Sequence, residues 1–526
     1  MKKNLFCLLA VVCTMCLMTA CSDDKEEPFV VPSKPVTYTT GNGLSLKIDD
    51  NSLQNATATF NPDAANPDKG TIVIKNNGSS KGVTPGENDI IPGTAVLTIP
   101  VELNATEAGA TFSGQSETEY YTYSYQGTMR NHEMRISIFD LASKNLHRPD
   151  AAMIFTDLNG LTLTYNGTPL IGKMVTFTPD AADNTKAVLT LEGAPLDITS
   201  ILGRANEAGF ATAGVLPGSP KTDLNVTLTS DLTESTFNGT GETEYCTFAY
   251  SGVLTNKTMK LDLTEVKLKN TSLAGTVWVP TEEHPNEMGM VEGSIYVNWV
   301  SDATFDPGFP PQMFVTMVCS MGLIPMPTPE NPDKVIDLNQ ALAMFLQKVR
   351  FTEDGNIIAD YLDEETMAPA TSPAGIAQYV VTDNNSILLF LNPAAIAADA
   401  NKSKADEGEN DMITELLGRI DMEQLINLAM TQYLPMLSNG VPVHFNASAD
   451  NGMNIYVDTD FLLPMLKIAA PAFEDKEFVD AFVAKMLEGT DLGMFGAMAS
   501  GVFKSIPAVV EGTSTIELGL SLTKAE

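Results

Sequence analysis

Acidic and aromatic residues alternate at one place in the sequence, and this is the first pattern that could carry chemistry. On a β-strand, Glu117, Glu119, Tyr121, Tyr123 and Tyr125 would share one face, because successive side chains point to opposite sides. Such a face suits sugar binding, since aromatic rings stack on sugar CH groups while carboxylates take hydroxyls or Ca²⁺. The pattern recurs later in the chain as Glu242, Glu244, Cys246, Phe248 and Tyr250.

The candidate ligand-binding residues in these two stretches are Tyr121, Tyr123, Tyr125, Phe248 and Tyr250. A second interpretation is that these side chains line a hydrophobic core, while the acids lie at the exposed start of a strand. Cys246 in the second stretch occupies the position of Tyr121 in the first. An unpaired cysteine prefers burial, so this difference favours the interpretation as a hydrophobic core.

The methionine residues supply another candidate for a binding site. Of the 25 Met, 17 follow residue 270, and Met494 and Met498 lie in a Gly- and Ala-rich stretch that is expected to be helical. Flexible thioethers suit an adaptable apolar pocket or a groove for a partner. The alternative is that they fill an ordinary core.

Metal and acid–base motifs are missing from the sequence. The four His are not spaced as ligand pairs, and His132-Glu133 lacks the second His of a zinc protease motif. There is no Gly-x-Ser-x-Gly, phosphate loop or dinucleotide fingerprint. We therefore assign no catalytic residue, metal ligand or cofactor. A glycosidase stays open, because its two carboxylates need not be close in sequence.

The N-terminus has the features of an export signal. Lys2-Lys3 precede the apolar run Leu5–Met18, and Leu17–Cys21 resembles a bacterial lipobox. Cleavage after residue 20 would leave a lipid on Cys21, which anchors the chain in a membrane. The alternatives are a plain signal peptide cut elsewhere and an uncleaved anchor. The acidic stretch 22–27 resembles the surface-export signal of Bacteroides-type lipoproteins, or is an ordinary solvated tether.

Charge and cysteine content narrow the possible partners. The net charge of −35 argues against nucleic acid. Only Cys246 and Cys319 remain after Cys21, so we expect neither a disulfide framework nor a zinc set.

A duplication organises the first half of the chain. Residues 111–145 align without a gap with residues 236–270, at an offset of 125, and 14 of 35 positions are identical. Upstream, Gly43–Leu46 matches Gly160–Leu163 at an offset of 117. The eight extra residues of the second copy are expected in the loop Ser200–Ala213. A match of this length indicates two copies of one structural unit.

Each copy has a period of two, typical of strands, with turns at Pro, Gly and Asn. In the first copy we expect strands at 44–48, 56–60, 71–75, 95–103, 118–129 and 134–141. Six strands in about 100 residues predict a small antiparallel barrel or sandwich.

After Asn270 the pattern mixes strands with amphipathic helices. One helix is expected after the cap Asp337, whereas Pro307–Pro332 is expected to be irregular. The predicted class is therefore mainly β with an α+β C-terminal domain: two small β barrels or sandwiches, then an antiparallel sheet with amphipathic helices. The predicted segments are a signal peptide (1–20), an acidic tether (21–40), β repeat 1 (41–150), β repeat 2 (151–272) and the C-terminal domain (273–526).

Several motifs resemble a known family of uncharacterised Bacteroides-type gut lipoproteins, domain of unknown function 4925. They are the lipobox with its acidic continuation, Gly160–Gly167, Gly172-Lys173, Val175–Asp180, Leu216–Gly218 and Leu273–Thr276. The resemblance is strongest in the second copy and implies a lipoprotein, but it assigns no functional residues. The entry Ala274-Gly275-Thr276 is also similar to calycin barrels, which hold apolar ligands, although Val277 interrupts the usual Gly-Thr-Trp.

We therefore expect a lipid-anchored protein of the outer membrane, facing the extracellular side and binding rather than catalysing. It would capture a ligand or nutrient, or serve as an accessory subunit of an outer-membrane complex, with an outer-membrane protein as its partner. The alternatives are an apolar-ligand carrier with a Met-rich C-terminal pocket and a glycan-active enzyme.

Overall fold

The computed structural model describes residues 28–77, 89–197, 209–285, 289–320, 326–328, 331–363, 366–400, 416, 418–448, 451–486 and 494–525. The protein is mainly β, with several antiparallel sheets and a set of helices in its C-terminal part, which confirms the predicted class in its coarse form. The chain divides into two compact units, Met1–Leu146 and His147–Glu526. No helix in the described ranges has the length and apolar character needed to cross a membrane.

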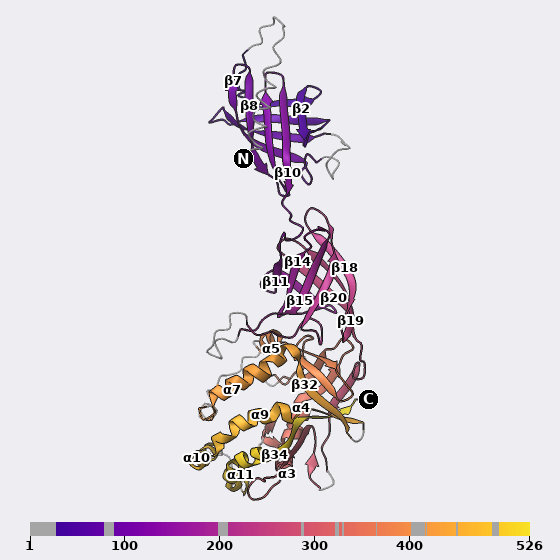
Figure 1. Cartoon of the computed structure of the whole chain (residues 1–526), viewed down its shortest axis with the longest axis vertical. Coiled ribbons are helices and arrows are strands. Elements are labelled where there is room, and N and C mark those ends of the chain that lie inside the picture. Colours follow the sequence, from indigo (N-terminus) through magenta and orange to yellow (C-terminus); the bar gives the residue numbers. More distant parts are fainter. Residues whose placement is uncertain are drawn as a thin grey trace. The chain divides into compact units, whose positions relative to one another are not determined.

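The first unit is built on one sheet with the order β6-β5-β4-β1-β2-β10-β9-β8-β7, and β3 lies beside β2 (Figure 1). Its strands are β1 (Val36–Thr40), β2 (Gly43–Ile48), β3 (Asn51–Ser52), β4 (Ala56–Pro62), β5 (Lys69–Asn76), β6 (Val96–Glu102), β7 (Asn104–Thr106), β8 (Gly109–Glu117), β9 (Tyr121–Met129) and β10 (Met134–Ser143).

The second unit begins with two sheets, ordered β11-β14-β15-β16 and β13-β12-β20-β19-β18-β17. Their strands are β11 (Met153–Thr156), β12 (Leu161–Tyr165), β13 (Thr168–Pro169), β14 (Lys173–Pro179), β15 (Lys186–Gly193), β16 (Lys221–Thr227), β17 (Thr229–Ser230), β18 (Ser235–Glu242), β19 (Cys246–Leu254) and β20 (Met259–Leu268).

Strand pairing is equivalent in the two copies. In the first copy Leu44 pairs with Met134 in a parallel ladder between β2 and β10. In the second copy Leu161 pairs with Met259 in the ladder between β12 and β20. These partners are related by the two offsets found in the sequence, 117 and 125. The aligned segments therefore occupy the same places in two similar arrangements of strands.

Cross-strand pairs of an aromatic residue and a glycine account for part of the shared sequence. In the first copy Gly114 pairs with Tyr125 and Phe112 pairs with Gly127. In the second copy Gly239 pairs with Tyr250 and Phe237 with Gly252. A Cβ added at Gly239 would lie 2.5 Å from the Tyr250 hydroxyl oxygen, so the ring occupies the space that the glycine leaves. An aromatic ring covering a strand glycine in this way stabilises the sheet.

The tyrosine of each pair also reaches another strand. The Tyr125 hydroxyl donates to the Pro100 carbonyl oxygen of β6, and the Tyr250 hydroxyl donates to the Asn225 carbonyl oxygen of β16 at 3.5 Å. The first bond connects two strands that are distant in one sheet, and the second connects strands of two different sheets. The shared Tyr therefore has a structural role in each copy.

The shared Glu-Thr-Glu-Tyr segment forms a turn, which corrects the predicted strand over 118–129. Strand β8 ends at Glu117 and β9 begins at Tyr121. The Thr118 hydroxyl oxygen accepts from the backbone N–H groups of Tyr120 and Tyr121 at 3.3 and 3.1 Å. Such local bonds from threonine favour a turn over a continuous strand. Glu117, Glu119 and Tyr121 therefore do not share one strand face.

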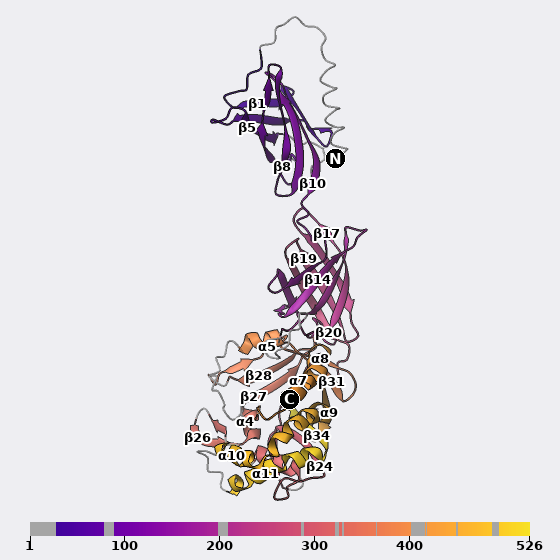
Figure 2. The ribbon, with the colours of Figure 1, turned by 60° about the vertical axis from the view of Figure 1, so that its left-hand side comes forward.

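The C-terminal part of the second unit is a sheet ordered β29-β28-β27-β21-β34-β33-β32-β31-β30, with β24 also paired to β34 (Figure 2). An isolated bridge between Asn356, just before β28, and Gln378 of β30 connects strands from opposite sides of this order. Its strands are β21 (Thr276–Pro280), β24 (Ile295–Ser301), β27 (Leu346–Phe351), β28 (Ile357–Leu362), β29 (Pro369–Thr371), β30 (Ala377–Val381), β31 (Ser386–Leu391), β32 (Val441–Ser448), β33 (Gly452–Val457) and β34 (Thr513–Lys524).

Helices and two small hairpins surround this sheet. The helices are α3 (Pro311–Ser320), α4 (Leu338–Phe345), α5 (Pro393–Ala400), α7 (Met422–Leu428), α8 (Leu434–Asn439), α9 (Thr459–Ala469), α10 (Lys476–Met486) and α11 (Met494–Glu511). The hairpins are β22 (His284–Pro285) with β23 (Val291–Glu292), and β25 (Met326–Thr328) with β26 (Asn331–Ile336). Helix α4 begins after its predicted cap, because the Asp337 carboxylate accepts from the Gln340 N–H at 2.9 Å. Helix α3 lies where an irregular segment was expected.

The second copy and the C-terminal sheet share one core. Buried side chains from both parts, including Leu268, Phe351 and Tyr379, belong to the same hydrophobic cluster. The Tyr165 hydroxyl donates to the Asp354 carbonyl oxygen. The Asn392 side-chain amide donates to the Ile171 carbonyl oxygen at 2.9 Å. The predicted boundary at 272/273 therefore does not separate two compact units.

One buried cation marks a difference between the copies. Lys173 is 2% exposed, and its Nζ donates to the Ala213 carbonyl oxygen at 2.9 Å. Burial lowers the pKa of this amine to about 8. The first copy has Ala56 at the matching position. Because Ala213 ends the segment expected to hold the extra residues, Lys173 fastens the end of that insertion to the core.

The Gly239→Ala variant tests the structural interpretation of the shared stretch. An unhindered strand glycine would gain stability on this change. Here the new Cβ would meet the Tyr250 ring, so we expect a loss of about 1–3 kcal/mol in the free energy of unfolding, measured by denaturant titration. Exposed Thr240→Ala is the control, with an expected change within about 0.5 kcal/mol. Unchanged or higher stability of Gly239→Ala would contradict the packing role.

Candidate functional site

The aromatic residues expected to bind ligand lie in the cores of the two copies. Tyr123, Tyr125, Phe248 and Tyr250 are 2%, 5%, 3% and 7% exposed. Tyr121 is half-buried and packs against the same core as Tyr123. These residues therefore form no exposed ledge, and the interpretation as a hydrophobic core describes their positions.

The carboxylates of this pattern are held at the surface by lysines. Glu117 lies 3.2 Å from the Lys144 Nζ, and Glu242 lies 3.0 Å from the Lys269 Nζ. Both pairs are solvent-exposed, so each contributes at most about 1 kcal/mol. The equivalent pairs fasten β8 to β10 and β18 to β20 in the two copies.

The remaining sequence candidates divide between described and undescribed parts. Met498 is half-buried in α11, which begins at Met494. The side chain of Met494 and all of Cys21 lie outside what the structure describes. The structure therefore leaves lipidation of Cys21 as a prediction.

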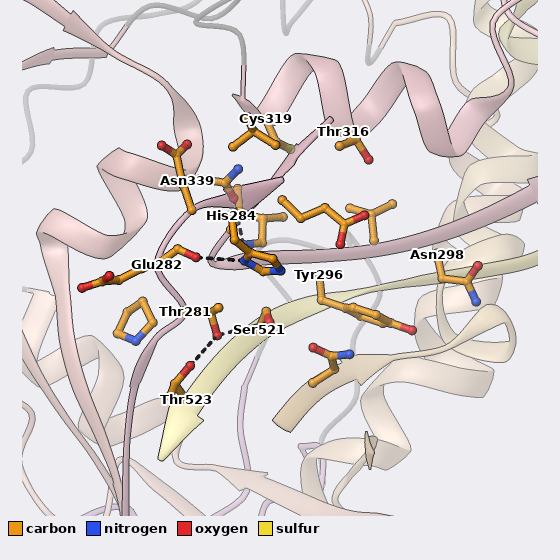
Figure 3. Close-up of a pocket in the computed structure, with 18 of the residues that line it drawn as sticks. Thr281, Glu282, His284, Tyr296, Asn298, Thr316, Cys319, Asn339, Ser521 and Thr523 are labelled. Carbon is orange, nitrogen blue, oxygen red and sulfur yellow. Dashed lines mark hydrogen bonds between the residues drawn. The ribbon is translucent and has the colours of Figure 1, made fainter. Parts of the chain in front are cut away.

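A cavity of about 800 Å³ lies in the C-terminal part of the second unit. It is bounded by residues 279–284, the hairpin β22–β23, strands β24 and β34, and helices α3 and α4. Figure 3 shows Thr316 and Cys319 of α3 on the side of the helix that faces the strand carrying Tyr296. The cavity lies in a different part of the second unit from the duplicated stretch.

Hydroxyl groups line the strand side of this cavity. The Thr281 and Thr523 hydroxyl oxygens lie 3.1 Å apart, and the Ser521 hydroxyl donates to the Thr281 hydroxyl at 3.3 Å (Figure 3). Thr281 and Ser521 are also joined through their backbones at 2.9 Å. The end of β21 and the last strand of the chain therefore present a row of hydroxyls.

Amide side chains build the helical walls. The Gln312 amide is fully used by β24, because its Oε1 accepts from the Trp299 N–H and its Nε2 donates to the Val297 carbonyl oxygen, both at 2.8 Å. Asn339 is 2% exposed, and its Oδ1 accepts from the Ile295 N–H at 3.0 Å. These bonds fix α3 and α4 against the edge of β24. Burial raises the pKa of the Cys319 thiol to about 11, so it stays protonated at neutral pH.

Tyr296 links the cavity to a second group of rings. Its hydroxyl donates to the Glu517 Oε2 at 2.8 Å, and the Asn298 Nδ2 donates to the same oxygen at 2.9 Å. Burial, and then the Glu517 carboxylate, raises the pKa of Tyr296 above its usual range. The phenol is therefore neutral at physiological pH, and its orientation is fixed by the carboxylate.

Three rings from neighbouring strands form what we term the tyrosine ledge: Tyr296, Tyr456 and His444. Tyr296 and Tyr456 both pair with Gly519, one from each side of β34, and their ring centroids are 5.1 Å apart. The His444 ring centroid lies 5.8 Å from that of Tyr456. All three side chains are half-buried. The C-terminal sheet thus carries the partly exposed aromatic surface that was expected in the duplicated stretch.

Hydrogen bonds continue from this ledge to a hydroxyl and a carboxylate. The Ser386 Oγ lies 3.2 Å from the His444 Nδ1, and the His444 Nε2 lies 3.0 Å from the Asp458 Oδ2. The Asp458 Oδ1 also accepts from the Phe461 N–H at the start of α9. Serine, histidine and aspartate in this order can pass a proton from the hydroxyl to the imidazole.

Charge in the cavity is negative at the mouth. Glu282, Glu283 and Glu292 belong to its lining together with His284, and all four are exposed. Among the described lining residues there is no Lys, Arg or Met. In the described ranges, no group of three or more His, Cys, Asp or Glu could hold a metal ion. The cavity therefore suits a polar ligand that carries no negative charge.

Sequence reasoning missed these residues, although a signal for them exists. Polar residues alternate at Ser294, Tyr296 and Asn298, as on one face of a strand. The same alternation recurs at Asn454, Tyr456 and Asp458. The pairing of both segments with Gly519 could not be derived from the sequence, because it depends on the register of β34.

Comparisons with protein families, with curated proteins and with solved structures found no match to this chain.

Proposed function

We propose that this chain is a lipid-anchored, surface-exposed binding protein without catalytic activity, and that its ligand site is the cavity between β24, β34 and α3. It would capture a ligand or nutrient, alone or as the accessory subunit of an outer-membrane protein. The observation that carries this proposal is the cavity of about 800 Å³, because small-ligand sites are concave and of this size. The fixed orientation of its walls by Gln312 and Asn339 supports it further.

The rest of the chain is consistent with attachment of the binding site to a membrane surface. The proposed lipid on Cys21 would hold the chain at the membrane. The two copies, which we interpret as duplicated small β barrels, lie in the sequence between that anchor and the segments that form the cavity. The resemblance to Bacteroides-type lipoproteins of domain of unknown function 4925 supports the same location.

The alternative function, a carrier of apolar ligands, is supported less well by the residues that line the cavity. Its described lining has hydroxyls, amides and carboxylates and no Met. Burying such groups under an apolar ligand costs free energy, because they lose their hydrogen bonds to water.

A thermal-shift panel tests binding in the cavity. The probes are a mixture of neutral oligosaccharides, glutamate, spermine and decanoate, each from micromolar to millimolar concentration. We expect at least one class to raise the Tm by about 2 °C or more with saturable concentration dependence, because a ligand stabilises the state that binds it.

Thr523→Trp, which fills the cavity from β34, should remove that shift. Exposed Ser514→Trp on the same strand is the matched control and should retain it. The proposed site would be contradicted if both variants kept the shift, or if no probe shifted the Tm of the native chain.

The anchor has a separate test. The full chain expressed in a bacterium that processes lipoproteins should incorporate labelled palmitate and sediment with the outer membrane. Cys21→Ser should remove both properties, because the thioether-linked lipid cannot form on serine. Equal labelling of the two chains would refute the anchor at Cys21.

The bonds from Ser386 through His444 to Asp458 favour a serine hydrolase as a second candidate function. In that reaction the Ser386 hydroxyl adds to an ester carbonyl while its proton passes to the His444 Nδ1. The alcohol leaves with that proton, and water then releases the acid by the same route.

A fluorophosphonate probe decides for or against this candidate. An active nucleophile would acquire the phosphonyl adduct at Ser386, read by mass spectrometry of the labelled peptide. His444→Ala should slow the labelling at least about 100-fold, because the general base is lost. Ser514→Ala, on an exposed serine, should leave it unchanged. No adduct at Ser386 in the native chain would exclude the hydrolase.

A further inference from the structure

The chemistry of the cavity lining narrows the ligand class, and this step rests on the proposed binding function. An anion such as a phosphate ester or a carboxylate needs cationic or N–H-rich partners when it leaves water. The described lining has no Lys or Arg, and three Glu surround the mouth. Anionic ligands are therefore disfavoured, because the described lining offers them no cationic partner.

Neutral groups dominate the interior of the same cavity. Thr281, Ser521 and Thr523 present hydroxyls, which both donate and accept. Asn298 and Asn454 add amides, and the Asn454 side chain makes no hydrogen bond within the described part of the chain. A ligand that satisfies such a surface must offer donors and acceptors in several directions, as a polyhydroxylated molecule does.

The cationic alternative fits less well. The glutamates at the mouth are exposed, so water screens their attraction for an amine. The neighbouring carboxylate of Glu517, outside the described lining, already accepts two hydrogen bonds from Tyr296 and Asn298 on one oxygen. Its charge is therefore partly balanced by donors of the protein.

Tyr296 supplies the remaining element of recognition. Its half-buried ring lines the cavity, its hydroxyl is tied to Glu517, and Tyr456 packs beside it. The ring face is therefore held in one orientation without a ligand, which limits the entropy lost on stacking. A pyranose presents a flat patch of CH groups to such a ring and hydroxyls around its edge.

A buried acceptor lies next to this arrangement. The Asn446 Oδ1 is buried and has no hydrogen-bond partner within the described residues, and Asn446 pairs with Asn454 across the β32–β33 ladder. An unpaired buried carbonyl costs free energy. A hydroxyl donor or a bridging water at this position would satisfy it.

We propose that the cavity binds a neutral saccharide, with one sugar ring stacked on Tyr296 and its hydroxyls bonded by Asn298, Asn454, Ser521 and Thr523. The tyrosine ledge would extend the site to a neighbouring sugar unit at Tyr456 and His444. Such a ligand is a neutral oligosaccharide, bound without cleavage.

Isothermal titration of the full chain provides the test. The neutral probes are maltoheptaose, xylohexaose, mannohexaose and N-acetylchitohexaose; the charged probes are oligogalacturonate and spermine. We expect at least one neutral probe to bind and oligogalacturonate not to bind.

Variants locate the contact. Tyr296→Ala should weaken the binding of that probe about tenfold or more, whereas Tyr296→Phe, which keeps the ring, should remain within about threefold. Asn454→Ala should cost about three- to tenfold, and it serves if Tyr296→Ala fails to fold. Tyr121→Ala in the first copy is the matched aromatic control and should leave affinity unchanged.

Three outcomes would overturn the proposal in distinguishable ways. Binding of spermine or oligogalacturonate alone, sensitive to Thr523→Trp, would refute the saccharide while the binding function stands. Binding of a neutral probe that responds to Tyr121→Ala and not to Tyr296→Ala would place the saccharide elsewhere. Binding of no probe of any class would remove both proposals.

Discussion

The C-terminal architecture depends on the insertion of the last strand into the middle of a sheet. β34 pairs with β33 along one edge and with β24 and β21 along the other. These partners come from regions up to about 240 residues away in the chain, as the pairing of Trp278 with Lys524 illustrates. The Thr523, Ser521 and Glu517 side chains reach the cavity or its rim only through this pairing. The candidate site therefore exists only when the end of the chain is in place.

A glycine that faces an aromatic ring recurs as a packing arrangement in the two copies. Tyr125 covers Gly114 and Tyr250 covers Gly239 in the two copies. In the C-terminal sheet, Tyr296 and Tyr456 meet beside Gly519. The first two rings are buried and hold strands together, whereas the last two stay partly exposed. A Cβ at Gly519 would meet the backbone of Ile455 and not a ring, so the two C-terminal tyrosines do not cover this glycine.

Much of the fold could be predicted from periodicity and turn residues. In the first copy β2, β4, β5, β6 and β10 follow from local patterns, as does the helix after Asp337. Strand β8 was not predicted, and β1 lies in the segment 21–40 that was expected to be a tether. Helix α3 was missed because prolines border its segment and because the Gln312 side chain bonds to β24 instead of solvent. The Thr316 hydroxyl donates to the Gln312 carbonyl oxygen of the same helix. The strand expected at 118–129 starts three residues late because Thr118 bonds to the backbone and makes a turn.

The candidate site was less accessible to sequence reasoning. The acidic and aromatic residues that alternate at 117–125 contribute to an ion pair, a turn and the hydrophobic core. Their repetition in the second copy therefore reflects packing. The residues of the cavity come from β21, β24, α3, α4, β33 and β34. None of these segments carries a motif, and only long-range strand register brings Asn454, Ser521 and Tyr296 together.

The central claim is that recognition takes place in the C-terminal cavity while the duplicated stretches serve as structure. Hydrogen exchange of the full chain, with and without a saturating mixture of maltoheptaose, xylohexaose, mannohexaose and N-acetylchitohexaose, tests it most directly. The account predicts slower exchange in peptides covering 276–301, 311–320 and 513–524, and unchanged exchange in 109–129 and 235–254. Protection confined to the duplicated stretches would contradict it.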